Sequence, residues 1–315
     1  MMNKKDNLLF LGTPEICIPF LELLKAHFNI SLLITQPDTM AGRDRKQKII
    51  PAAKTFALAN NIEVIQPETL NDDTLVEKIK PIEPFIGIVI AYGKIIPKRI
   101  FEIPRCGTIN VHFSLLPYYR GSAPVQRALE NGDTKTGITI FEIEKKMDAG
   151  DIWAQKEINI LPDDTTGTLW ERMSREGAPF LIDTIKKIIE KKIHKYPQDH
   201  EKATEAPMVR KEEGIIDWKY LTARQVYNKS RAFTPWPGIC FCSKGKTFKM
   251  TKVRVSALTH DKQPGDILSW DKQGLNVACS QGTVLEVLEL QPPGKKPMTP
   301  YCYCMGNELP DCLLL

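Results

Sequence analysis

The first 190 residues alternate short apolar runs with segments that repeat apolar residues at helical spacing. Apolar residues at consecutive positions are typical of strands that are covered on both faces of a parallel sheet. Helical segments recur between these runs, as expected for strands joined by covering helices. Predicted strands lie at 8–11, 30–35, 62–65, 85–90 and 137–143, and predicted helices at 15–25, 52–60, 70–79 and 166–192. The pattern predicts a doubly wound, Rossmann-like α/β domain with a parallel sheet.

The pattern changes near residue 200. The stretch 194–207 is polar, contains two prolines and shows little periodicity, so we interpret it as a linker. Beyond it, short β-prone segments are separated by Gly, Pro, Asp or Lys, which is typical of a small antiparallel barrel. These predicted strands lie at 238–243, 247–256, 266–270, 275–280 and 283–291. We therefore predict an α/β domain at 1–193 and a small β-barrel domain at 208–315.

Composition narrows the class of protein further. The chain has 315 residues, of which 42% are hydrophobic and 26% charged, as in soluble globular proteins with two domains. No apolar run approaches the ~18 residues that span a bilayer, and no signal-peptide core follows the first residues. We therefore expect a cytoplasmic protein with no membrane partner. The net charge of +5 is modest, so binding of nucleic acid would depend on a local basic patch.

The eight cysteines are expected to be reduced thiols. Two pairs, Cys240/Cys242 and Cys302/Cys304, raise the possibility of a zinc site. Their one-residue gap is shorter than the usual spacing of zinc ligands, and neither a third pair nor a histidine lies close by in the sequence. We interpret each pair as alternate residues of a strand, and we expect no metal.

A candidate catalytic segment begins with the predicted strand that contains Asn110 and His112. Residues two apart on a strand share a face, and the carboxyl ends of strands in open α/β sheets bind ligands. An amide and an imidazole can both donate hydrogen bonds to a developing oxyanion. Asp148, in a loop after the strand at 137–143, could orient the imidazole and move protons. Alternatively, His112 could be a structural histidine and Asp148 an ordinary turn aspartate. The spacing of the residues alone does not decide between these interpretations and a catalytic role.

A basic run follows the second predicted strand. It places four cations in six positions, namely Arg43, Arg45, Lys46 and Lys48. Such a run is often only a solvated loop. Its place at the carboxyl edge of the sheet also suits contact with RNA phosphates beside the chemistry. The lysine-rich strands of the second domain could supply another basic surface or could simply protect exposed strand edges.

Several short motifs follow one another in a fixed order from the first strand to about Met298. The most specific combines Asn110-Val111-His112 with Ser114-Leu115-Leu116-Pro117. The others are FLGTP at 10–14, QPD at 36–38, AYG at 91–93, RG at 120–121, GIT at 137–139, MDAGD at 147–151, PWP at 235–237 and QPPGKK at 291–296. In these motifs and their order, the chain resembles the folate-dependent formyltransferase family.

The resemblance implies a site and a reaction. It implies that the second domain is OB-like. It also implies that 10-formyltetrahydrofolate donates a formyl group to the α-amine of initiator methionyl-tRNA, a step of translation initiation. This chemistry is expected to need no metal. We expect the enzyme to act as a monomer. The residues that the resemblance assigns are Asn110, His112 and Asp148 for catalysis, Ser114, Leu115, Leu116 and Pro117 for folate, and Arg43, Arg45, Lys46 and Lys48 for tRNA.

The chain departs from the family pattern in two places. Phe113 stands where the family usually has glycine, and a regular strand would turn it away from the face of His112. After Met298 the sequence no longer resembles the family, so we expect the last barrel strand or terminal helix to be absent or replaced. Three other functions are kept as alternatives: formyl transfer to another amine such as a nucleotide-linked amine, release of formate by hydrolysis, and a non-catalytic RNA-binding module.

Overall fold

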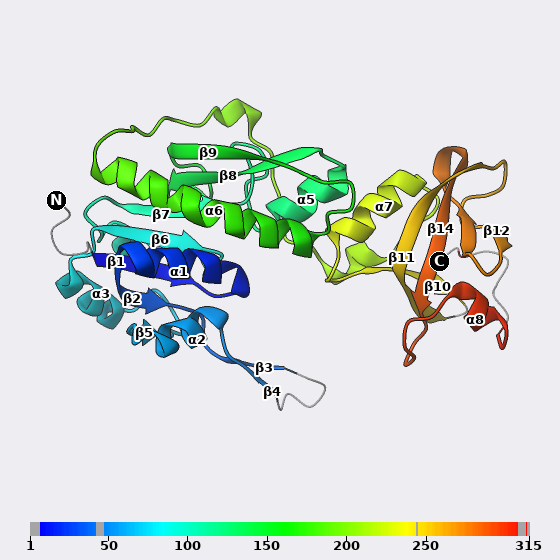
Figure 1. Cartoon of the computed structure of the whole chain (residues 1–315), viewed down its shortest axis with the longest axis horizontal. Coiled ribbons are helices and arrows are strands. Elements are labelled where there is room, and N and C mark those ends of the chain that lie inside the picture. Colours follow the sequence, from blue (N-terminus) through cyan, green and yellow to red (C-terminus); the bar gives the residue numbers. More distant parts are fainter. Residues whose placement is uncertain (1–6, 42–46, 244, 308–312, 314–315) are drawn as a thin grey trace. The chain divides into compact units, whose positions relative to one another are not determined.

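The computed structural model describes residues 7–41, 47–243, 245–307 and 313, and it forms two compact units (Figure 1). Unit 1 comprises Met1–Pro124, Lys135–Asn159 and Trp170–Pro207. Unit 2 comprises Val125–Thr134, Ile160–Leu169 and Met208–Leu315. Residues 194–207, interpreted above as a linker, belong to unit 1. The domain bounds 1–193 and 208–315 stay a prediction.

Unit 1 contains a seven-stranded sheet in the order β5-β2-β1-β6-β7-β8-β9. The first five strands in this order are parallel, whereas β8 and β9 run antiparallel to their neighbours. The doubly wound parallel sheet is therefore confirmed for five strands, and the complete sheet is mixed. The strand bounds are β1 Asn7–Gly12, β2 Asn29–Ile34, β5 Val64–Ile65, β6 Ile86–Ile90, β7 Thr108–His112, β8 Lys135–Glu142 and β9 Ile152–Asn159.

Both faces of the central strands are buried, which explains their continuous apolar sequences. Leu9 and Leu11 of β1 join one core cluster with residues of α3 and α4. On the other face, α6 approaches so closely that a Cβ on Gly177 would lie 2.9 Å from the ring of Phe20 in α1. The helices are α1 Ile18–His27, α2 Ala52–Ala59, α3 Asp73–Ile79, α4 Lys98–Phe101, α5 Pro124–Asn131 and α6 Thr166–Ile189.

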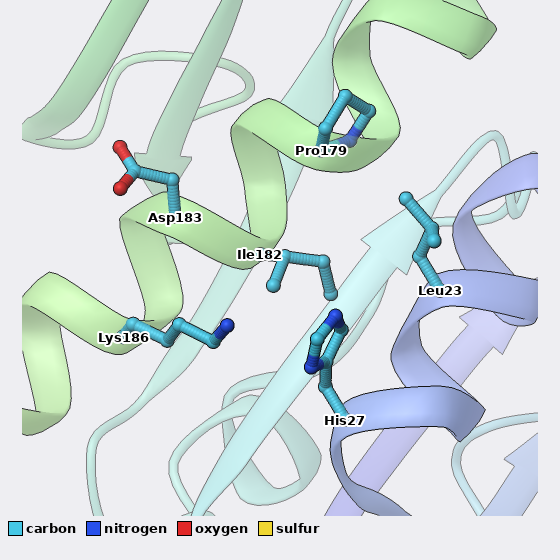
Figure 2. A pocket seen from close by; sticks show the side chains of 6 residues that line it. All are labelled: Leu23, His27, Pro179, Ile182, Asp183 and Lys186. Atoms are coloured by element: carbon cyan, nitrogen blue, oxygen red, sulfur yellow. The ribbon is translucent and has the colours of Figure 1, made fainter.

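An open groove lies between α1 and α6 (Figure 2). It is lined by Leu23, His27, Pro179, Ile182, Asp183 and Lys186. The groove lies on the helices themselves, and the polar residues at the end of β7 take no part in its lining.

Unit 2 contains a five-stranded antiparallel sheet in the order β10-β11-β14-β13-β12. All five strands predicted for this region are confirmed. Helix α7, Ala223–Ala232, contacts β11 and β14, and its Thr222 cap forms a capping box with Gln225. The strand bounds are β10 Ile239–Ser243, β11 Lys246–Thr259, β12 Ile267–Trp270, β13 Leu275–Ala278 and β14 Thr283–Gln291.

The two cysteine pairs have different structures. Cys240 and Cys242 are alternate residues of β10, as predicted. The strand prediction is wrong for Cys302/Cys304, because α8, Pro300–Cys304, is a helix whose Thr299 hydroxyl caps the Cys302 N–H. Thr followed by Pro is a helix-start signal that outweighs the alternation of cysteines. No cluster of three or more potential ligands (His, Cys, Asp or Glu) for a metal ion occurs among the residues that the structure describes.

The segment after Met298 packs on the second sheet through the short helix α8. The buried ring of Tyr303 in α8 meets Phe248 of β11 edge-on, with 5.4 Å between the ring centroids. Leu313 is also buried, and its N–H donates to the carbonyl oxygen of Gly265. In the described part of the chain, no helix combines the length and apolar character needed to cross a membrane.

Gly150, just before β9, tests how tightly the turn after β8 is packed. A Cβ at this position would lie 1.8 Å from the carbonyl oxygen of Glu142, which is a backbone atom that cannot move aside. We expect Gly150→Ala to lower the free energy of unfolding by about 3 kcal/mol or more, measured by denaturant unfolding followed by circular dichroism. The matched control is Gly167→Ala, where the nearest atom is 3.7 Å away, and it should be neutral or slightly stabilising. Equal unfolding midpoints for the two variants would contradict this packing.

Candidate active site

The candidate site begins on β7, an interior strand that is held between β6 and β8. Asn110 pairs with Val89 of β6 and Phe141 of β8, so its backbone position is fixed from both sides. His112 is the last residue of the strand and is only 5% exposed. Since residues two apart on a strand share a face, the sheet presents the amide of Asn110 and the imidazole of His112 on the same side.

The tautomer of His112 follows from its hydrogen bond. Its Nε2 lies 2.8 Å from the backbone carbonyl oxygen of Tyr119, which can only accept a hydrogen bond. Nε2 therefore carries a proton and donates it to this carbonyl. In the neutral ring, Nδ1 is then the nitrogen that can accept a proton. The ring also packs edge-on against Phe141, with 6.3 Å between the centroids, which fixes its plane.

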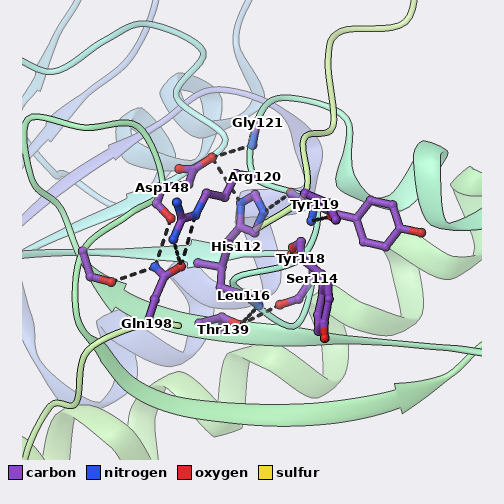
Figure 3. A network of polar contacts seen from close by, with 12 residues as sticks. His112, Ser114, Leu116, Tyr118, Tyr119, Arg120, Gly121, Thr139, Asp148 and Gln198 are labelled. Atoms are coloured by element: carbon purple, nitrogen blue, oxygen red, sulfur yellow. Dashed lines mark hydrogen bonds and ion pairs between the residues drawn. The ribbon is translucent and has the colours of Figure 1, made fainter. Parts of the chain in front are cut away.

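Asp148 lies next to the proton-accepting nitrogen of His112 (Figure 3). Its Oδ2 is 3.9 Å from Nδ1, and its side chain is only 13% exposed. The same oxygen accepts a hydrogen bond of 2.7 Å from the backbone N–H of Gly121. The structure thus brings together two of the three residues predicted for catalysis, His112 from the end of β7 and Asp148 from the turn after β8. A carboxylate at this distance stabilises the protonated imidazole through its charge.

The predicted folate segment is a loop that is held by β8 and β9. The hydroxyl of Ser114 is buried and donates to the carbonyl oxygen of Tyr118 at 2.7 Å. The N–H of Leu116 donates to the Thr139 hydroxyl at 3.1 Å, and its carbonyl accepts from the amide of Gln155 at 2.8 Å. These bonds fix the backbone from Ser114 to Leu116.

Leu115 requires a glycine beside it. A Cβ on Gly137 of β8 would lie 2.3 Å from Cδ2 of Leu115 and 2.6 Å from the backbone carbonyl oxygen of Lys156, so a larger residue would force these segments apart. Phe113 turns to another part of the fold, where its buried ring meets Phe20 of α1 edge-on at 6.3 Å between centroids. The large side chain at this position is therefore accommodated in the core, as the alternation of the strand predicted.

Residues 194–207 contribute to the site, which the sequence did not indicate. The N–H of Arg120 donates to the carbonyl oxygen of Thr204 at 2.8 Å, and the N–H of Ala206 donates to that of Arg120 at 2.6 Å. The hydroxyl of Thr204 accepts from the N–H of Tyr119 at 2.8 Å. We call residues 194–207 the strap. It holds the loop whose backbone binds His112 and Asp148, so the interpretation of these residues as a linker is incomplete. Its polar, aperiodic sequence carries no local signal of that role.

Two short strands, β3, Thr39–Ala41, and β4, Gln47–Ile49, pair antiparallel as a hairpin, and Lys48 of the basic run lies on β4. Arg43, Arg45 and Lys46 lie outside the described residues. Lys48 is described, and its Nζ is 2.9 Å from Oδ2 of Asp38, which also binds Lys54 at 2.8 Å.

Asp38 anchors the base of this hairpin. Hydrogen bonds to its carboxylate from Lys54 first, and then from Gln66 and Lys48, hold the pKa of Asp38 well below its usual range. The carboxylate therefore stays charged at neutral pH and keeps its lysine partners. The charge of Lys48 is in part satisfied within the protein, although its side chain is exposed.

Comparisons with known proteins agree with this architecture. The family model for formyl transferase matches residues 15–185, and the model for the formyl transferase C-terminal domain matches residues 208–308. The second match continues past Met298, so the expectation that the resemblance ends there is wrong. The chain is 40% identical to methionyl-tRNA formyltransferase of Acetivibrio thermocellus over 304 residues, covering 96% of this chain and 97% of that protein. It is 36% identical to the enzyme of the same name from Natranaerobius thermophilus over 305 residues, with the same two shares.

A solved structure shares the fold at lower identity. The N-formyltransferase from Helicobacter canadensis, in complex with folinic acid and dTDP-3-aminofucose, superposes with a TM-score of 0.67 at 19% identity. The match covers 90% of this chain and 98% of that one. From the two family models and the identity to full-length relatives, the chain belongs to the formyl transferase family and is a formyltransferase with both the N-terminal and the C-terminal domain of that family.

Proposed function

We propose that the enzyme transfers the formyl group of 10-formyltetrahydrofolate to the α-amine of initiator methionyl-tRNA. The observation that carries the mechanism is the pair formed by His112 Nδ1 and Asp148 Oδ2 at 3.9 Å, beside Asn110 on the same strand face. The choice of acceptor is supported by the relatives at 36–40% identity, which are named for methionyl-tRNA and match nearly the whole chain.

The donor is proposed on the chemistry of the loop after β7. A relative of this fold was solved with folinic acid, a formylated folate. The candidate folate segment here, Ser114 to Pro117, has a backbone already held by Thr139 and Gln155. A loop fixed before binding loses little conformational entropy when it meets a flat ring system. The half-buried side chain of Leu115 and the ring of Pro117 give it apolar surface for that contact.

Proton transfer in this mechanism depends on His112. An α-amine has a pKa near 7.7–8.0, and the adjacent ester of an aminoacyl-tRNA lowers it, so a neutral amine is present at physiological pH. Nδ1 of His112 accepts a proton as the amine attacks the formyl carbon, while Tyr119 holds the Nε2–H and Asp148 stabilises the imidazolium. The same proton is then returned to the departing folate nitrogen, so His112 ends the reaction neutral.

The oxyanion is assigned to Asn110. Since both nitrogens of His112 are occupied by Tyr119 and by proton transfer, the amide of Asn110 supplies the hydrogen bond to the oxygen that becomes negative. The nearby charge of the imidazolium adds to that stabilisation. The carboxylate of Asp148 acts on His112, and it also accepts a hydrogen bond from the backbone N–H of Gly121.

The alternatives differ in acceptor or in chemistry. The Helicobacter canadensis relative was solved with an amino-sugar nucleotide, which is the other amine to test. A purely RNA-binding module gives no reason for a buried histidine to face a carboxylate, so the His112–Asp148 pair favours an enzyme.

A formyl-transfer assay with charged initiator tRNA, charged elongator tRNA and an amino-sugar nucleotide, each with 10-formyltetrahydrofolate, tests the proposal. Formate released without any acceptor would indicate hydrolysis instead.

His112→Ala tests the proton-transfer role. We expect kcat for formyl transfer to fall by ~10²–10³-fold, because the variant loses both the general base and the imidazolium charge. The matched control, His27→Ala, removes an exposed imidazole on α1 and should keep the wild-type kcat. Wild-type turnover by His112→Ala would reject the assignment.

Asp148→Asn tests the charge of the carboxylate while keeping an oxygen that can accept from Gly121. We expect kcat to fall by about 10²-fold, with little change in KM for either substrate, because the imidazolium loses its counter-charge. The control is Asp151→Asn, three residues along the same loop, whose carboxylate lies 3.9 Å from Lys195. Equal kinetics for the two asparagine variants would contradict the role of Asp148.

Arg43→Ala tests the proposed RNA contact of the basic run. Loss of one phosphate contact should raise KM for methionyl-tRNA and reduce the salt dependence of binding by about one unit of log–log slope, while folate binding persists. Lys48→Ala should have a smaller effect, because Lys48 already binds Asp38. The control is Arg175→Ala on α6, whose guanidinium pairs with Glu171. An unchanged salt slope in Arg43→Ala would remove this residue from the RNA surface.

A further inference from the structure

Gln198, in the strap 194–207, uses the full hydrogen-bonding capacity of its side chain beside Asp148 (Figure 3). Its amide nitrogen donates to the carbonyl oxygens of Asp148 at 3.0 Å and Gly150 at 2.8 Å. Its oxygen accepts from Nε of Arg120 at 3.2 Å and from Nη2 at 2.6 Å. The residue is only 6% exposed. An amide can make two donor and two acceptor contacts, and all four are present here.

These contacts close a ring around Asp148. Gln198 holds the backbone carbonyl of Asp148, and the N–H of Gly121 holds its carboxylate at 2.7 Å. Gly121 is joined by a peptide bond to Arg120, and the guanidinium of Arg120 returns to Gln198. Both the main chain and the side chain of Asp148 are therefore fixed by one connected set of groups.

Asp148 has a backbone conformation that needs such support. Its φ of +49° lies in the left-handed region, which residues other than glycine rarely adopt. Two residues later, Gly150 packs directly on the backbone of Glu142. The carbonyls of Asp148 and Gly150 point to the same amide nitrogen, so a single side chain fixes the turn that aims the carboxylate.

We propose that Gln198 is a positioning residue that sets the distance and angle between the Asp148 carboxylate and the His112 imidazole. This inference rests on the proposed function, in which these two groups handle the proton. Gln198 is not one of the reacting groups, and it acts through its hydrogen bonds to the turn that contains Asp148 and Gly150. Because a misplacement of about 1 Å can cost a reaction ~10²-fold, loosening this turn slows the chemical step more than it weakens substrate binding.

Gln198→Met is the principal variant, since methionine has similar length and no hydrogen-bonding amide. We expect kcat to fall by ~10–10²-fold, with KM for 10-formyltetrahydrofolate and methionyl-tRNA near wild type. Gln198→Glu is the second variant, because its carboxylate still accepts from Arg120 but cannot donate to the two carbonyls. We expect it to be as slow as Gln198→Met. Wild-type turnover by Gln198→Glu would overturn the proposal, because the donors to the turn would then be unnecessary.

The matched control removes a buried hydrogen bond elsewhere in unit 1. In Thr184→Val, the α6 hydroxyl that donates to the carbonyl oxygen of Phe180 at 2.8 Å is lost. Thermal unfolding of all variants measures the general cost of such a loss. A kcat in Thr184→Val as low as that in Gln198→Met would show that destabilisation alone explains the effect, and would overturn the positioning role.

A readout without substrate separates this inference from the proposed function. The NMR signals of the His112 ring, assigned by their absence in His112→Ala, should shift in Gln198→Met and Gln198→Glu but not in Thr184→Val. Unshifted signals together with normal kcat in Gln198→Met would reject the role of Gln198 alone. Full activity of His112→Ala would instead reject the proposed function, whatever the Gln198 variants do.

Discussion

A carboxylate that is largely removed from water must be met by fixed hydrogen-bond donors or by a cation, and the site of unit 1 is organised around this requirement at Asp148. The backbone N–H of Gly121 supplies the donor, and the imidazole of His112 becomes the cation when it gains a proton. Each group comes from a different segment of the chain. The loop after β7, the turn after β8 and the strap 194–207 must therefore be correctly placed together before the carboxylate can be stabilised.

The sheet and the loops divide this task between them. Strand β7 is paired with a neighbour on each side, so it fixes the backbone of Asn110 and His112 with little dependence on side-chain detail. The tautomer of His112 is set by a backbone carbonyl, that of Tyr119, which no side-chain substitution at Tyr119 removes directly. A change of tautomer would require the loop itself to move. This arrangement links proton chemistry to loop geometry, and it explains why the groups that hold the loop matter for the reaction.

The sequence predicted those parts of the fold whose signal is local. Continuous apolar runs found the central strands, and alternation with turn residues found all five strands of unit 2. Strand β9 was missed because most of its residues are only partly buried and its sequence is mixed in character. The pairing of His112 with Asp148 was predicted from a family resemblance. Gln198 was missed because its role lies in reaching the backbone carbonyls of a distant turn, and such a contact leaves no pattern around Gln198 itself.

The basic hairpin shows why a count of charges overstates what a partner can use. Four cations in six positions fit either a solvated loop or an RNA contact, and Asp38 already pairs with Lys48 and Lys54 at the base of the hairpin. A phosphate that binds Lys48 must compete with this carboxylate, whose low pKa keeps it charged throughout the physiological range. The net attraction of Lys48 for RNA is therefore reduced, while its bond to Asp38 fixes where the hairpin begins. Within the basic run, Lys48 thus serves to position the hairpin strands, and contact with RNA stays a prediction for Arg43, Arg45 and Lys46.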